Sequence, residues 1–251
     1  MVLKAKNMWK IKDKRVVLLQ SGGLDSCYLA CFLSKLDFEI HHLYVDYGQN
    51  ANKKELEAVE KIVAEYGGTL HKAKLDMPWL HDSTILCGHE VGEYGVSETM
   101  GCVEAKTYVP MRNHLLISLA SSLAESLDIK YIASALDGSQ DIFGRPKGGT
   151  PDKHPNFVKK LEQSLSEAST IKHIKHDKFE IIAPTISQTK ETNILRGLYL
   201  GCDFGLSWTC YNNSDEPCGE CCACIDRANH FANVGVEDPL ISRKNNSKPL
   251  E

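Results

Sequence analysis

The sequence predicts an α/β fold built on a doubly wound, mostly parallel sheet with helices on both faces. Short runs of β-branched and leucine residues alternate with apolar stripes at helical spacing, and the first run ends in paired glycines that lead straight into a helix. The chain has 251 residues, 42% of them hydrophobic, and can bury a sizeable core. We expect an α/β domain over residues 1–206, a cysteine-rich module packed on it over residues 207–240, and a loose tail over residues 241–251.

Two β-α units begin the chain. Val16 to Gln20 predicts a strand buried on both faces, and apolar residues from Tyr28 to Leu36 follow at helical spacing. Ile40 to Tyr47 predicts the second strand. The second helical stripe runs from Leu56 to Tyr66, and Gly67 follows it where a C-terminal cap is expected.

The middle of the chain mixes regular and irregular segments. Thr69 to Leu75 predicts a third strand, and residues 77–108 lack a clear period. This segment either crosses the mouth of the fold or is a plain surface excursion. Asn113 is expected to cap a helix that extends to Leu127, and Lys130 to Ser134 predicts the fourth strand.

The last part of the α/β pattern follows a loop at residues 136–153. Helices are expected around Phe157 to Leu165 and Lys190 to Leu200, on either side of a strand at Phe179 to Ala183. From Ser207 onward the sequence changes to cysteine-rich turns. This alternation completes the predicted parallel sheet.

Charge and composition exclude several classes of protein. A formal net charge of -4 argues against an extended nucleic-acid surface and favours a small substrate. No segment is apolar enough for a membrane span, and no signal-peptide pattern follows the basic N-terminus. We therefore expect a cytoplasmic protein, whose ten cysteines are thiols or metal ligands.

The stretch Ser21-Gly22-Gly23-Leu24-Asp25-Ser26 stands at the carboxyl end of the first strand, where ligands bind in open α/β sheets. Paired glycines allow a sharp turn and close approach of a ligand, and the free N–H groups of a helix start favour an anion. It matches neither a Walker loop nor a dinucleotide fingerprint. The alternative is an ordinary corner capped by Asp25 or Ser26.

The hexapeptide resembles the Ser-Gly-Gly-x-Asp-Ser signature of the PP-loop ATP pyrophosphatases, which split ATP between its α and β phosphates and adenylate an acceptor. The resemblance implies an adenine nucleotide alpha hydrolase-like fold in which this turn holds pyrophosphate. Lys190 stands where that superfamily has a phosphate-facing lysine, and Arg112 lies at another strand-to-helix junction. Both could neutralise the departing pyrophosphate, although a solvated charge at a helix start is the alternative for each.

Four cysteines near the C-terminus have the spacing of a metal site. Cys210, Cys218, Cys221 and Cys224 lie within fifteen residues, and Pro217 and Gly219 permit tight turns between them. Four thiolates fill a tetrahedral shell, so the expected Zn²⁺ is structural. We expect Cys222 to be spare, and Cys27 and Cys31 to be buried packing residues.

Together with "VDYGQ" from Val45, "VPMRN" from Val109 and the cysteine spacing, these features resemble the 7-cyano-7-deazaguanine synthase (QueC) family over nearly the whole chain. Those enzymes adenylate the carboxylate of 7-carboxy-7-deazaguanine, let ammonia displace AMP, and then activate and dehydrate the amide to a nitrile. The resemblance implies ATP, Mg²⁺ and Zn²⁺ as cofactors and a homodimer. It also implies that Asp46 lies by the nucleotide or metal.

The sequence departs from this family at two places. Asn50-Ala51 stand where Arg-His is usual, and Lys153-His154 stand where Cys-Arg is usual, after a lengthened loop. The departures leave open a paralogue that passes the activated acyl group to another amine, such as one on a partner protein. A tRNA thiolase and a non-enzymatic zinc module are further alternatives, which the charge balance and the glycine turn oppose respectively.

Overall fold

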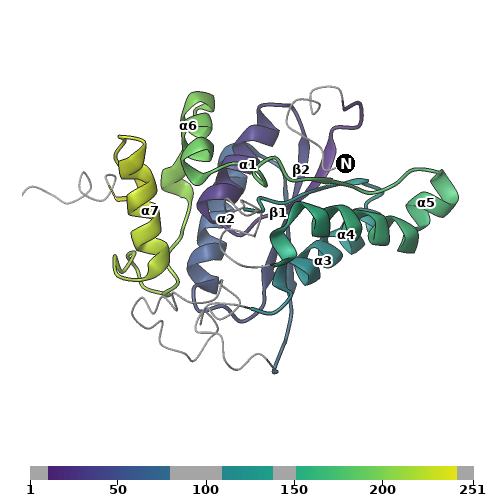
Figure 1. Cartoon of the computed structure of the whole chain (residues 1–251), viewed down its shortest axis with the longest axis horizontal. Helices are drawn as coiled ribbons and strands as arrows, with labels where there is room; N and C mark the ends of the chain where they lie inside the picture. The colour runs from purple at the N-terminus through teal and green to yellow at the C-terminus, as the bar shows by residue number, and fades with distance from the viewer. Residues whose placement is uncertain (1–10, 80–108, 138–150, 242–251) are drawn as a thin grey trace, which may run out of the picture.

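A computed structural model describes residues 11–79, 109–137 and 151–241 of the chain (Figure 1). The segments expected to be irregular, at residues 77–108 and 136–153, lie largely outside the described residues, and so does nearly all of the tail beyond Leu240. The described part contains the complete predicted sheet. No helix within it has the length and apolarity needed to cross a bilayer.

The sheet is parallel throughout, as predicted, with the strand order β3-β2-β1-β4-β5. Residues Val16 and Ile40 are partners in the β1–β2 ladder, and Val17 and Ile132 are partners in the β1–β4 ladder. The strands are β1 (Arg15–Leu19), β2 (Glu39–Asp46), β3 (Thr69–Lys74), β4 (Tyr131–Ala133) and β5 (Glu180–Ile182).

Helices cover both faces of the sheet, which confirms the doubly wound prediction (Figure 1). On one face α1 packs against α2 and α6, and α7 packs outside α6; on the other, α3 packs against β1, β4 and α4. The α-helices are α1 (Leu24–Ser34), α2 (Asn52–Tyr66), α3 (Arg112–Ser126), α4 (Pro155–Ala168), α5 (Thr170–Lys175), α6 (Lys190–Leu200) and α7 (Cys222–Asn233). The 3-10 helices of the described ranges are η3 (Pro151–Lys153) and η4 (Phe204–Leu206).

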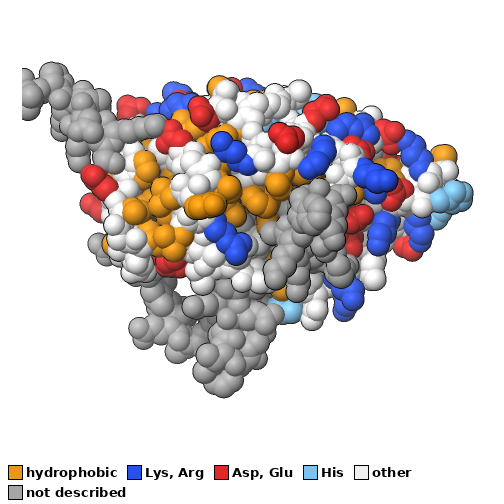
Figure 2. Space-filling model, turned by 90° about the horizontal axis from the view of Figure 1, so that it is seen from above, with side chains coloured by type: hydrophobic (Ala, Val, Ile, Leu, Met, Phe, Trp, Pro, Cys, Tyr) orange, Lys and Arg blue, Asp and Glu red, His pale blue; other side chains and the backbone are white. Residues whose placement is uncertain are grey.

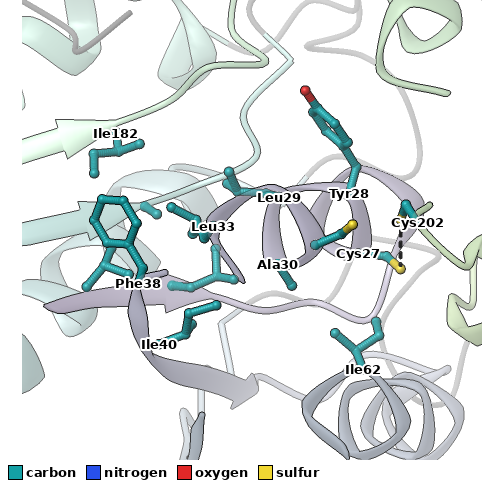
Figure 3. Close-up of a cluster of buried hydrophobic side chains, with 14 of the residues drawn as sticks. Cys27, Tyr28, Leu29, Ala30, Leu33, Phe38, Ile40, Ile62, Ile182 and Cys202 are labelled. Carbon is teal, nitrogen blue, oxygen red and sulfur yellow. Dashed lines mark hydrogen bonds between the residues drawn. The ribbon is translucent and has the colours of Figure 1, made fainter. Parts of the chain in front are cut away.

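The central strand is buried on both faces. Val16 and Leu18 belong to the core under α1, whereas Val17 belongs to the core under α3. Figure 3 shows the first of these clusters, in which α1 lies over the sheet and the thiols of Cys27 and Cys202 are 3.9 Å apart. Cys27 and Cys31 are fully buried, as predicted for packing residues.

One local prediction was wrong, and one short helix was missed. Asn113 lies inside α3, and the cap position belongs to Met111, a non-glycine residue with a left-handed φ of 52°. The side chain of Asn113 instead donates to the carboxylate of Asp152. The short helix α5 was not predicted, because six residues are too few to show a helical period.

Candidate functional site

A pocket of about 350 Å³ lies at the carboxyl ends of the strands, where the order of the sheet reverses between β1 and β4. Open α/β sheets bind ligands at this switch point, because the loops after the two strands diverge to opposite faces there. The walls come from the glycine turn, the end of β2, the start of α3, the end of β4, η3, the start of α6, and the C-terminal segment with α7. Segments far apart in the sequence therefore converge on one cavity.

The glycine turn forms one wall of the pocket. Its lining residues are Ser21, Gly23, Leu24, Asp25 and Ser26. The start of α1 has no hydrogen bond from a capping side chain, so the alternative of a corner capped by Asp25 or Ser26 is wrong. Uncapped N–H groups and the positive end of a helix dipole make this wall suited to an anion.

The hydroxyl groups of the turn are held in one network. Ser21 Oγ lies 3.2 Å from Ser26 Oγ and accepts from the backbone N–H of Gly23 at 3.3 Å. Ser26 Oγ donates to the carbonyl of Gly23 at 3.0 Å. These bonds fix the hydroxyl oxygens at the helix start.

Gly22 lies behind the pocket and does not line it. It has a φ of 76°, and a Cβ placed on it would lie 2.6 Å from the backbone carbonyl oxygen of Glu55. Its own carbonyl accepts from the N–H of Trp208 at 2.8 Å. Glycine is required here because the turn is pressed against α2, and the same turn anchors the C-terminal segment.

Lys190 lies at the start of α6 and lines the pocket, as predicted. Burial raises the pKa of the nearby Asp25 carboxyl, while the charge of Lys190 and a 2.9 Å hydrogen bond from Asn193 oppose that shift. Thr189, not Lys190, caps the helix by accepting from Thr192. The positive charge of Lys190 therefore lies in the pocket, near the start of α1.

Arg112 is the first residue of α3, and it also lines the pocket. Its Nη1 donates to the hydroxyl of Tyr47 at 3.0 Å, and the guanidinium lies 5.7 Å from the centre of the Tyr47 ring. These contacts with Tyr47 raise the pKa of Arg112 despite its burial. A permanent positive charge is thus fixed in the cavity.

A third cationic residue, Lys153, enters the pocket from η3. The buried carboxylate of Asp152 accepts from the backbone N–H and the side chain of Asn113, which pins η3 to the start of α3. Burial lowers the pKa of Lys153, and the positive charges of Arg112 and Lys190 lower it further. Both departures from the expected family pattern therefore reach the site, because Ala51 lines the pocket as well.

Asp46 does not line the pocket among the described residues. Its Oδ1 accepts from the backbone N–H of Gly48 at 2.9 Å, which closes the turn after β2. The structure therefore places this predicted site residue beside the pocket, in a bond that shapes the loop.

Glu55, in the first turn of α2, lines the pocket instead. Its Oε2 accepts from Gln49 Nε2 at 2.8 Å. Burial raises the pKa of Glu55 to about 7, although the hydrogen bond from Gln49 and the charge of Arg112 oppose the shift. A carboxyl group that changes charge near neutral pH thus faces the cavity.

The C-terminal segment closes the last side of the pocket. Arg227 on α7 donates to both oxygens of Asp238, at 2.7 and 2.8 Å, and to the hydroxyls of Ser207 and Thr209. His230 lines the pocket, and its Nδ1 lies 2.7 Å from Glu191 Oε1 at the start of α6. That bond holds the pKa of Glu191 down at about 2.

The four predicted cysteines converge. The sulfur atoms of Cys210, Cys218, Cys221 and Cys224 all lie within 4.8 Å of one another, and no other group of this kind is found in the described part of the chain. The Cys210–Cys218 and Cys218–Cys224 sulfur distances are 3.5 and 3.9 Å. Zinc bonds to sulfur of about 2.3 Å place tetrahedral ligands about 3.8 Å apart, so the quartet fits Zn²⁺. Cys222 is outside it, as predicted.

Several pocket residues were not found from the sequence. Tyr47 belongs to the motif that begins at Val45, but the motif predicts no role for its side chain, and Glu55 precedes the apolar stripe that predicts the second helix. Trp208, Tyr211 and His230 come from the cysteine-rich part, which was interpreted for metal binding alone. Their position beside the glycine turn depends on long-range contacts such as the Trp208 to Gly22 hydrogen bond.

Comparisons with known proteins indicate one family over most of the chain. The family described as "Queuosine biosynthesis protein QueC" matches residues 15–235. A 7-cyano-7-deazaguanine synthase of Methanosarcina barkeri is 32% identical over 243 residues, which cover 91% of this chain and 98% of that protein. Proteins with the same name from Archaeoglobus fulgidus and Cupriavidus metallidurans are 33% and 34% identical; the matches cover 91% and 90% of this chain and 90% and 96% of those proteins.

Proposed function

The chain belongs to the QueC family, and on that premise we propose that it uses ATP to convert 7-carboxy-7-deazaguanine to 7-cyano-7-deazaguanine. The observation that carries the proposal is the uncapped start of α1 in a pocket that also holds Lys190 and Arg112. An anion site beside two cations suits a reaction in which pyrophosphate departs.

The proposed reaction has two activation steps. A carboxylate oxygen attacks the α-phosphorus of ATP and pyrophosphate leaves, which gives an acyl adenylate. Ammonia attacks the acyl carbon and AMP leaves with that oxygen, which gives the amide. The amide oxygen then attacks the α-phosphorus of a second ATP and pyrophosphate leaves; loss of AMP, which takes the amide oxygen, and of both N–H protons gives the nitrile.

The described residues have separate parts in these steps. The N–H groups at the start of α1, with Ser21 and Ser26, would hold phosphate oxygens, and Lys190 would neutralise charge on the leaving pyrophosphate. Mg²⁺ would provide further counter-charge to the triphosphate, and Asp25 is an oxygen ligand of suitable type in the same wall. The quartet of Cys210, Cys218, Cys221 and Cys224 would bind Zn²⁺ and stabilise the C-terminal wall.

The test is incubation with ATP, Mg²⁺, ammonium and 7-carboxy-7-deazaguanine, with release of pyrophosphate and the mass of the base as readouts. We expect acid-dependent pyrophosphate and a nitrile product. Lys190→Met should slow pyrophosphate release roughly a hundredfold, because a preorganised charge at the leaving group is lost. Lys160→Met, on the exposed side of α4, is the matched control. An unchanged acid with the wild-type enzyme contradicts the proposal.

A second candidate is a paralogue that transfers the acyl group from AMP to another amine, such as one on a partner protein. The observation in its favour is Lys153, which brings a cation into the pocket where the family usually has a cysteine. Incubation with ATP, the acid and candidate partners, followed by intact mass measurement, separates the two. A partner that gains the mass of the acyl group supports the second candidate. Formation of the nitrile when ammonium is present, with no acyl group transferred to any partner, supports the first.

A further inference from the structure

Aromatic side chains and one carboxyl group share a wall of the pocket. Tyr47, Trp208 and Tyr211 line it together with Glu55. Tyr47 and Tyr211 pack against Val109, and Tyr211 also belongs to the cluster that holds Trp208. Aromatic faces with a polar group at their edge are the usual environment of a bound planar base.

The carboxyl group of Glu55 is held in place, but only one of its two oxygens accepts a hydrogen bond from the described residues. Gln49 donates to Oε2, and Gln49 is itself held by its bond from the backbone N–H of Tyr47 and its contacts with Tyr44 and Val45. No hydrogen bond reaches Oε1 from the residues that the structure describes. The carboxylate therefore keeps acceptor capacity on the pocket side.

We propose that Glu55 recognises the guanine-type edge of the base, by accepting hydrogen bonds from the ring N1–H and the exocyclic 2-amino group. This inference rests on the proposed function, since it assigns the base-reading residue of that reaction. Two adjacent N–H donors need acceptors at the same edge, and an ionised carboxylate is an acceptor without donors.

The same geometry discriminates between bases. Adenine presents an unprotonated ring nitrogen at the corresponding position, and its lone pair would face the carboxylate oxygen. That contact is repulsive, so Glu55 would keep the adenine of ATP out of the base position. Burial raises the pKa of Glu55, and the two N–H donors of a guanine-type edge would favour its ionised form.

The other carboxyl groups that line the pocket are Asp25, Asp137 and Asp226, and they are less suited to this task. Asp137 acts on Asp25 and Lys153 and not on Tyr47. Asp25 accepts from Asn193 and lies near Lys190 at the start of α1, on the anion-binding wall. Asp226 lies on α7, outside both aromatic clusters. Among the carboxyl groups compared, Glu55 alone lies within charge range of Tyr47, which belongs to the aromatic wall.

Equilibrium binding of 7-deazaguanine and 7-deazahypoxanthine, which lacks the 2-amino group, tests the inference. We expect the wild-type protein to bind 7-deazaguanine at least about tenfold more tightly, as for a hydrogen bond to a charged group. Glu55→Gln should weaken 7-deazaguanine binding roughly 10- to 100-fold and reduce the preference to about threefold or less. Glu57→Gln, on the same helix but outside the pocket, is the matched control.

The outcomes are distinguishable. Unchanged affinity of a non-hydrolysable ATP analogue shows that Glu55→Gln is folded, and a retained preference for 7-deazaguanine then overturns the inference while the proposed function stands. Failure of the wild-type protein to bind either base overturns both the inference and the proposed function.

If Glu55→Gln does not fold, the preference of the wild-type protein for 7-deazaguanine is the test. This preference should shrink on acidification from pH 8 to pH 6, and a constant preference overturns the inference. The charged and ionisable groups that act on Glu55 in this titration are Arg112, Asp46, Tyr44 and Tyr47.

Discussion

Gly22 and Gly23, the two glycines of the glycine turn, differ in what the structure requires at each position. Gly22 combines a left-handed φ with a close approach to the carbonyl of Glu55, whereas Gly23 has a φ of -75° and no contact shorter than 3.3 Å at its Cβ position. The two requirements cannot be distinguished in the sequence. They predict different responses to the same substitution.

Gly22→Ala should reduce the free energy of unfolding by about 3 kcal/mol or more, because a left-handed alanine and a backbone contact of 2.6 Å add to each other. Gly23→Ala should change it by less than about 1 kcal/mol, since its backbone is one that alanine adopts. Urea unfolding of the two variants measures both values. Equal losses would contradict the packing role given to Gly22.

Glu55 should make stability depend on pH in an unusual direction. Its pKa is about 7 in the folded protein and about 4.5 when unperturbed, so between these values the folded state holds the extra proton. The contribution of Glu55 to the free energy of unfolding is therefore complete below pH 4.5. It decreases as the pH rises toward 7, and the total loss is roughly 3 kcal/mol.

The measurement is the difference in unfolding free energy between the wild-type protein and Glu55→Gln from pH 4.5 to pH 8. The difference should move in favour of the glutamine variant as the pH rises, because glutamine never carries the buried charge. Arg112 attracts and Asp46 repels the ionised carboxylate. A difference that does not vary with pH would contradict the assignment.

The sequence predicted those site residues whose role can be inferred from neighbouring residues in the chain, and it missed those whose role depends on contacts in space. Lys190 was predicted from its match to the phosphate-facing lysine of the PP-loop superfamily, and Arg112 from its place at a strand-to-helix junction; both start a helix at the pocket. Asp46 was assigned to the ligand, yet its carboxylate is bonded to Gly48, a contact that a motif does not reveal. Glu55 was missed because its importance comes from Arg112 and Gln49 in space.

At the scale of elements, the strands and long helices followed from periodicity, and their ends shifted by only a few residues. All five predicted strands are present, because buried parallel strands have continuous apolar runs. The capping of α3 was not predictable from Asn113 alone, since Asp152 binds that side chain from a distant part of the sequence. The resemblance marked Lys153 as a departure near the chemistry, but η3 is held at the pocket by the bonds of Asp152 to Asn113, which the sequence does not show.

The cysteine module should depend on metal. Cys218→Ser should lose bound Zn²⁺ and unfold at lower temperature, because a tetrahedral shell loses one of four thiolates. Cys222→Ser, one residue from the quartet but outside it, should keep both the metal and the melting temperature. Elemental analysis and thermal unfolding give the readouts. Equal metal content in the two variants would contradict the assigned ligand set.

At the scale of the whole molecule, the fold brings distant segments to one pocket. The glycine turn contacts the C-terminal segment through Trp208, and η3 contacts the start of α3 through Asp152. His230 and Glu191 connect α7 to α6. The site therefore requires the α/β sheet and the cysteine-rich module together, which explains why family similarity extends to residue 235.

Exposed apolar residues on α6 are a candidate dimer face. Tyr199 is 90% exposed and Leu195 is 53% exposed, one turn apart on the same helix. Figure 2 shows hydrophobic side chains gathered on the face seen from above the view of Figure 1, where α6 lies at the top. Unpartnered apolar surface of this kind favours association of two copies.

We expect a homodimer that Leu195→Glu converts to a monomer, because a charge would be buried at the contact. Ile174→Glu changes an even more exposed apolar residue on α5, far from α6, and should leave the dimer intact (Figure 1). Light scattering after size-exclusion chromatography gives the mass of each variant. A Leu195→Glu dimer would show that the α6 face is not the contact.

The central claim is that the carboxylate of a 7-deazapurine is adenylated in this pocket. The most direct measurement uses 7-carboxy-7-deazaguanine with heavy oxygen in its carboxyl group and follows the label into the nucleotide products by mass spectrometry. Adenylation predicts heavy oxygen in AMP and none in pyrophosphate, because the bond from the carboxylate oxygen is made to the α-phosphorus. Unlabelled AMP, or label in inorganic phosphate with ADP as the nucleotide product, would contradict the account.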